Sequence, residues 1–236
     1  MKQIIKGLAC LALLLPLVAC ATSPRAVVWD YGIGSNVDDI WATQALFYRN
    51  GKIIVDRTNS AGGSYTATSK KRIAQPSYWM GGIGLPNPAG VPVPDKARVE
   101  IVSFIDRKRY RIEVDLPADL EKQMRQVYQL PDGRKAQRNE LYFGLAPGGY
   151  YEVLLYSLRK LDPDILLARG LAEEVTDDWR DEITPLETQY ENTMAAFDKK
   201  YGETLKQTPP PSGMAWAPIM DAYRAKQPRT DTTPVN

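Results

Sequence analysis

The sequence predicts an α+β fold in which several β-hairpins form an antiparallel sheet, with one long and one or two short helices packed on it. Three observations lead to this prediction. Turn-forming residues join three pairs of apolar segments, two other segments have helical periodicity, and strands do not alternate with helices as in βαβ units. The chain shows no internal repeat, so we expect a single domain from residue 26 to residue 226.

The first predicted hairpin spans residues 40–56. Apolar segments flank Asn50-Gly51. This pair favours a type I′ turn, because both residues tolerate the positive φ that matches the twist of the flanking strands. A strand at residues 26–31 is expected to precede the hairpin and to be ended by Gly32 and Gly34.

Two more hairpins and two short strands are predicted farther along. One hairpin turns at Asp106-Arg107-Lys108, and its second strand alternates between apolar and charged residues, as a half-buried strand does. The other turns at Pro147-Gly148-Gly149, and its second strand is apolar on both sides, which indicates a central position. The predicted strands are residues 99–104, 109–116, 140–146, 150–156, 165–167 and 170–175.

Two helices are predicted from apolar spacing. A short helix begins at Pro117 and places Leu120, Met124 and Val127 on one face. The longer helix covers residues 185–201: Thr184 is a good N-cap, Pro185 suits the first helical position, and Glu187 completes a capping box. Gly202 is expected to end it. We expect residues 227–236 to be disordered.

The N-terminus is typical of an exported lipoprotein. Residues 7–19 form an apolar run that is shorter than the ~20 helical residues needed to cross a bilayer, and Lys2 and Lys6 precede it. The segment resembles a bacterial lipobox, in which Cys20 becomes the lipid-modified first residue after residues 1–19 are removed. Residues 20–25 would then be a tether, and fatty acyl chains such as palmitate on Cys20 would form the anchor.

Composition narrows the classes of function. The net charge of +2 comes from lysines of the signal segment, so the mature chain is balanced and nucleic-acid binding is not expected. The chain has no histidine, which excludes histidine-based catalytic triads and most zinc sites. We therefore predict a protein that is not an enzyme and that uses no cofactor or metal.

Carboxylate pairs and clusters are the remaining candidates for chemistry. Asp38-Asp39 could serve as acid-base or metal-binding carboxylates, but adjacent carboxylates in a loop are more often simply solvated. The acidic residues around Trp179 lack the spacing of a calcium loop. We predict that the first pair is simply solvated and that the second group interacts with the dipole of the helix that follows it.

The glycine- and proline-rich segment from residue 58 to residue 96 carries aromatic residues and allows two interpretations. In one, a loop is pinned to the sheet by its aromatic side chains; in the other, these side chains form a contact surface, since aromatic residues and arginine are favoured in binding hot spots. Together with two residues that precede the long helix, the candidate partner-binding residues are Tyr65, Tyr78, Trp79, Met80, Trp179 and Arg180.

Several segments resemble a family of Gram-negative lipoproteins that contain a domain of unknown function. They are the strand with Trp29, the glycine- and proline-rich middle, residues 110–117, and above all the stretch Tyr142-Phe-Gly-Leu-Ala-Pro-Gly-Gly149. Members of such families are often found beside phospholipase effectors of type VI secretion and resemble immunity proteins. The resemblance implies a periplasmic binding protein that neutralises a lipase. Because Ala21, rather than Asp, follows Cys20, it also implies an outer-membrane anchor.

Two alternatives remain open at this point. A housekeeping lipoprotein of the envelope would bind lipid, peptidoglycan or an assembly partner, and a carboxylate-based hydrolase would depend on a single Asp or Glu. The sequence does not determine the partner or the oligomeric state.

Overall fold

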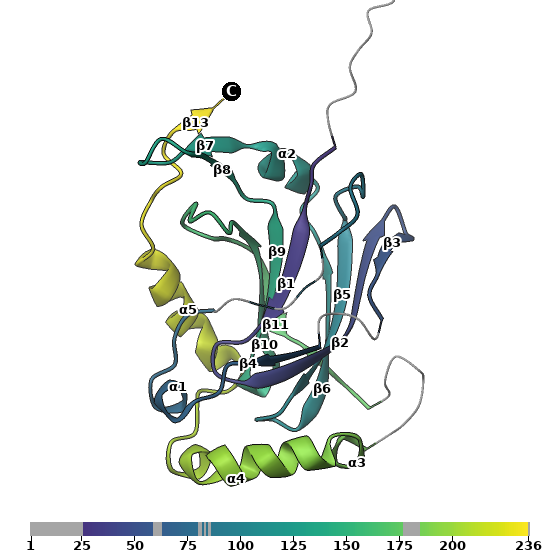
Figure 1. The fold of residues 1–236 in the computed structure, drawn as a ribbon, viewed down its shortest axis with the longest axis vertical. Helices are drawn as coiled ribbons and strands as arrows, with labels where there is room; N and C mark the ends of the chain where they lie inside the picture. The colour runs from purple at the N-terminus through teal and green to yellow at the C-terminus, as the bar shows by residue number, and fades with distance from the viewer. Residues whose placement is uncertain are drawn as a thin grey trace, which may run out of the picture.

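The computed structural model describes residues 26–58, 63–79, 82, 84, 86–176 and 185–235. These residues form an α+β fold with two larger β-sheets, a small third sheet and a few helices (Figure 1). Strands of both larger sheets contribute to one hydrophobic core, which includes Trp29, Phe47 and Phe143. All strand pairs in the described part of the chain are antiparallel except the parallel pair β1–β9. The predicted fold class is confirmed.

The first sheet has four strands in the order β1-β9-β10-β11. These are β1 (Asp30–Gly34), β9 (Glu140–Ala146), β10 (Tyr150–Tyr156) and β11 (Ile165–Leu171). The 3-10 turn η1 (Pro147–Gly149) joins β9 to β10 and confirms the third predicted hairpin. Gly148 and Gly149 have φ of 77° and 72°, a region that favours glycine.

The second sheet has the order β12-β6-β5-β2-β3, and β4 pairs beside β2. Its strands are β2 (Asp39–Arg49), β3 (Lys52–Asp56), β4 (Gly63–Thr66), β5 (Lys96–Ser103), β6 (Lys108–Asp115) and β12 (Glu173–Val175). The hairpins β2–β3 and β5–β6 are the first two that were predicted. Positive φ at Asn50 and Gly51 agrees with a type I′ turn.

The first strand differs from the prediction. It was expected at residues 26–31, ended by glycines, but β1 runs from Asp30 to Gly34 and contains Gly32 and Gly34. Both glycines leave room for neighbours: a Cβ on Gly34 would meet the Tyr142 side chain and the backbone at Gly82. Here glycine allows close packing of a strand rather than ending it. The expected core residue Trp29 is 1% exposed.

A third, small sheet was not predicted. It consists of β7 (Val127–Gln129), β8 (Lys135–Gln137) and β13 (Pro234–Val235), in the order β13-β7-β8. The segment from residue 227 onward, expected to be disordered, is therefore ordered through residue 235. The buried Arg138 guanidinium holds it by donating to Asp231 at 3.0 Å, and the Asp162 N–H donates to the Thr230 hydroxyl at 2.8 Å.

The described helices are short except for one. They are α1 (Lys70–Ala74), α2 (Leu120–Arg125), α3 (Leu186–Gln189), α4 (Glu191–Gln207) and α5 (Trp216–Ala225), and the turn η2 (Gly213–Ala215) precedes α5. In the described part of the chain, no helix is long and apolar enough to cross a membrane.

The long helix was predicted only in part. It is interrupted at Tyr190, so that α3 and α4 replace one continuous helix, and α4 continues through Gly202 to Gln207. Burial of Tyr201, whose hydroxyl donates to the Thr68 carbonyl at 2.8 Å, helps to offset the roughly 1 kcal/mol that a helical glycine costs. The proposed N-cap Thr184 lies outside the described residues.

Candidate binding site

The predicted partner-binding residues are spread over several regions. Cys20, Met80, Trp179 and Arg180 lie outside the described residues. Tyr65 belongs to β4, whereas Tyr78 and Trp79 lie in the segment that follows α1. The described members therefore belong to two separate environments.

Trp79 makes contacts within the fold. Its ring stacks on Tyr150 at a centroid distance of 6.4 Å and an angle of 8°, and its indole N–H donates to Glu152 at 2.8 Å. Tyr78 lies against Tyr223 of α5 at 6.2 Å. These contacts match the first interpretation of this segment, a loop pinned to the sheet by its aromatic side chains. A role of Tyr78 and Trp79 in binding stays a prediction.

Glu152 is the centre of a buried charged cluster. Its side chain is fully buried and accepts hydrogen bonds from Trp79, from the Tyr150 hydroxyl at 2.7 Å and from the Arg224 guanidinium. Arg224 also donates to Asp221 at 2.8 Å. Removing one partner from a buried carboxylate strongly destabilises the folded protein. The cluster therefore fastens α5 and the Trp79 segment to β10.

An aromatic groove lies where Tyr65 is located. It has a volume of about 280 Å³ and lies between the β2–β4 strand pair and one face of α4. Trp41 of β2 and Tyr65 of β4 line the strand side; Phe197 and Lys200 line the helix side. Trp41 is 39% exposed, which is unusual for a tryptophan, and its ring lies 6.0 Å from that of Tyr190.

The groove combines apolar surface with separate charged groups. Asp39 accepts a hydrogen bond from the Thr68 N–H at 2.8 Å, and the Lys200 nitrogen lies 4.8 Å from the centre of the Tyr201 ring. Burial raises the pKa of Tyr65, and nearby Arg72 opposes that shift. Among the described strands, β4 pairs only with β2. A groove of this kind suits a peptide segment or an aromatic anchor of a partner protein.

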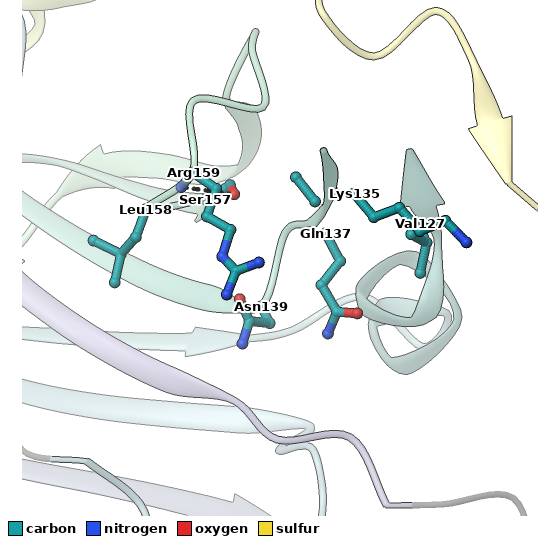
Figure 2. A pocket seen from close by; sticks show the side chains of 8 residues that line it. Val127, Lys135, Gln137, Asn139, Ser157, Leu158 and Arg159 are labelled. Atoms are coloured by element: carbon teal, nitrogen blue, oxygen red, sulfur yellow. Dashed lines mark hydrogen bonds between the residues drawn. The ribbon is translucent and has the colours of Figure 1, made fainter. Parts of the chain in front are cut away.

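A second cavity of about 450 Å³ lies between β8 of the small sheet and the loop that follows β10 of the first sheet. Figure 2 shows Arg159 and Asn139 close to each other, with Gln137 beside them and Lys135 toward β7. The Arg159 N–H donates to the Ser157 hydroxyl at 3.2 Å, which shapes the loop. This cavity was not predicted, because its lining residues mix polar and apolar types, come from distant segments and form no motif.

Comparison with known proteins gives a family but no function. The family model described as a protein of unknown function, DUF2931, matches residues 17–213. The chain belongs to the DUF2931 family. No curated protein matches the chain. No solved structure matches it either.

Within this DUF2931 chain, the stretch Tyr142–Gly149 has a clear structural role. A Cβ on Gly144 would come within 2.7 Å of the Trp79 ring, and one on Gly148 would collide with the backbone at Gly213. Tyr142 is buried and lies 6.2 Å from Tyr156. The tyrosines at 142, 150 and 156 and Trp79 thus form an aromatic layer, while Tyr151 packs against the core between the sheets.

The prediction that Asp38 and Asp39 form a solvated pair is wrong for Asp38. Asp38 is 1% exposed, accepts a hydrogen bond from the Ile105 N–H at 3.0 Å and is bonded to the Ser103 hydroxyl. Burial raises the pKa of Asp38 well above its usual range, although both bonds oppose this shift. The turn after β5 packs over the carboxyl, which explains its burial. Asp38 therefore fixes the turn after β5 instead of facing solvent.

One further carboxyl has an unusual environment. Glu140 of β9 lies beside Asp30 of β1 in the parallel strand pair. Burial, with a smaller contribution from the charge of Asp30, raises the pKa of Glu140 to about 7. A carboxyl with such a pKa could exchange protons at neutral pH. Among the described residues, no cluster of three or more Cys, Asp or Glu residues could hold a metal.

Proposed function

We propose that this protein is a lipid-anchored binding protein of the periplasmic face of the outer membrane, which neutralises a lipase effector of type VI secretion. The anchor would be Cys20. The supporting structural observation is the aromatic groove between the β2–β4 pair and α4, in which Trp41 is 39% exposed and Tyr65 is partly buried. Tryptophan and tyrosine in such positions are typical anchors of protein interfaces.

The choice of a lipase as partner rests on the sequence resemblance to immunity lipoproteins. The first test is whether a lipase-like gene lies beside this one. That neighbour is then expressed in the periplasm with and without this protein. We expect the protein to restore growth. Unchanged toxicity would refute the proposal for that pair of proteins.

The anchor has a separate test. A Cys20→Ser protein carries no thioether lipid, so we expect it to leave the membrane fraction. Because a multiply acylated cysteine holds a protein firmly, at about 0.8 kcal/mol per buried CH₂ group, the difference should be complete. A Cys20→Ser protein that remains tightly bound to membranes would contradict the proposed lipidation.

A housekeeping role in the envelope is the second candidate. The observation that favours it is the cavity of about 450 Å³ whose lining includes Lys135 and Arg159, a suitable size for a small ligand. This role predicts that deletion of the gene harms cells in the absence of any toxin, whereas the immunity role predicts harm only when the toxin is present.

A further inference from the structure

The wall of the cavity between β8 and the loop after β10 contacts a segment that lies only eight residues after the proposed anchor. The Asn139 side chain, which lines the cavity, donates to the Val28 carbonyl at 2.9 Å. Val28 follows Cys20 by eight residues, and an extended chain spans at most about 3.3–3.6 Å per residue. The wall of this cavity therefore lies within about 30 Å of a lipid attached to Cys20.

The lining of the cavity matches a phospholipid headgroup. Lys135 and Arg159 provide two cations, and Gln137, Asn139 and Ser157 provide uncharged hydrogen-bonding groups (Figure 2). In the described part of the chain, neither cation takes part in an ion pair. A phosphate ester would pair with the Arg159 guanidinium, which lies beside Asn139 (Figure 2), and the polar groups would suit the hydroxyls of a glycerol headgroup.

The rim of the cavity is apolar. Leu158 is 75% exposed, and Val28, on the adjacent segment, is 55% exposed. Exposed aliphatic side chains beside basic groups are the arrangement found at membrane interfaces. Of the nearby acidic residues, Asp132 is engaged by Arg134 at 2.6 Å, and Lys160 lies two residues from Asp162. Asp132 and Asp162 thus each have a basic neighbour.

We propose that this end of the protein docks on the membrane that holds its anchor, with the headgroup of an anionic phospholipid in the cavity and Leu158 inserted at the interface. The inference rests on the anchoring part of the proposed function and not on the lipase. It assigns the two ends of the first sheet to different tasks. The end with Leu158 faces lipid, and the opposite end, with Leu171, faces the periplasm.

The test uses the full lipid-anchored protein on vesicles. Cys10 lies in the signal segment and the lipid occupies Cys20, so a Leu158→Cys variant carries one reactive thiol for a nitroxide label. Leu171→Cys is the matched control: Leu171 is 56% exposed and pairs with Tyr150, at the far end of β10 from residues 156–158. Accessibility to a water-soluble nickel chelate is measured for both labels.

We expect the Leu158 label to be protected in vesicles that contain phosphatidylglycerol, while the Leu171 label stays accessible. Replacing both cations, in Lys135→Glu with Arg159→Glu, should restore accessibility, because each basic group near an anionic surface contributes about fivefold to the docked population. Equal accessibility of the two labels on phosphatidylglycerol vesicles would overturn the docking inference and leave the proposed anchor intact. Loss of the protein from the vesicles would instead refute the anchor, and the inference with it.

Discussion

The indole of Trp79 lies against the backbone of β9 at Gly144, so closely that a Cβ atom at position 144 would approach three ring atoms to 2.7–2.8 Å. The same indole stacks on Tyr150 and donates to Glu152. One side chain thus links the glycine-rich loop, the β9–β10 hairpin and the buried charged cluster. This arrangement explains why a glycine is needed in the middle of a central strand.

The first prediction concerns this contact. Gly144→Ala should destabilise the protein by about 1–3 kcal/mol, because the added methyl group forces the Trp79 ring away from the strand. Thermal unfolding monitored by circular dichroism measures the change, and tryptophan fluorescence reports the displacement of the ring. A variant with wild-type stability would show that the ring moves at no cost.

Gly202 provides a matched control for this substitution. It lies within α4, and a Cβ there would have its nearest neighbour at 3.9 Å. Because alanine is the better helix former, Gly202→Ala should stabilise the protein by about 0.5–1 kcal/mol. Opposite signs for the two glycine-to-alanine changes are therefore expected.

The second prediction concerns the charge of Glu152. Glu152→Gln keeps the shape of the side chain but leaves the partly buried Arg224 with only the more exposed Asp221 carboxylate as an ion-pair partner. Removing one member of a buried ion pair typically costs about 3–5 kcal/mol, so we expect a large fall in the urea midpoint. Glu121→Gln, in the surface pair with Arg125, should cost less than about 1 kcal/mol. Similar effects of the two changes would contradict the role given to Glu152.

Local patterns allowed the three main hairpins to be predicted, since each depends on a turn and two adjacent strands. The β7–β8 hairpin escaped prediction although its turn at Pro131-Asp132-Gly133 is recognisable in the sequence. Its strands have three residues each, too few for periodicity, and the third strand, β13, comes from the chain terminus. Long-range pairing of this kind leaves no local pattern.

Of the residues that line the aromatic groove, only Tyr65 was predicted to bind a partner. Its partner Trp41 lies in a strand whose neighbour Ile40 is fully buried, and no sequence pattern distinguishes a tryptophan that turns outward from one in the core. The burial of Asp38 was missed for the same reason. It depends on Ser103 and the backbone of Ile105, which lie more than sixty residues away in the chain.

The third prediction concerns pH. The pKa of Glu140 in the folded protein is about 7, above its ordinary value of 4.5, so the native state holds its proton more tightly than the unfolded state does. Stability should therefore decrease as pH rises from about 4.5 to 7 and then level off. The decrease should stay below about 3.5 kcal/mol, since one pKa unit corresponds to about 1.4 kcal/mol and solvent screens this partly exposed carboxyl.

Glu140→Gln isolates this effect from other titrating groups such as Asp38. The variant should lose the Glu140 contribution, so that its stability relative to the wild type improves between pH 4.5 and pH 8. Urea unfolding at a series of pH values measures the difference. A difference that does not change with pH would show that the folded and unfolded pKa values of Glu140 are equal.

The last prediction concerns the aromatic groove. If Trp41 is an anchor for the lipase, Trp41→Ala should weaken binding by about thirtyfold or more, since hot-spot residues contribute at least about 2 kcal/mol. Tyr65→Ala, on the neighbouring strand, should weaken it as well. Isothermal titration calorimetry with the purified lipase measures both, and thermal unfolding verifies that the variants are folded.

Ile53→Ala is the control, because Ile53 is 53% exposed on β3 but does not line the groove. Binding that survives Trp41→Ala and Tyr65→Ala together would remove the groove as the interface, whereas loss in these variants and not in Ile53→Ala would locate the interface between β4 and α4.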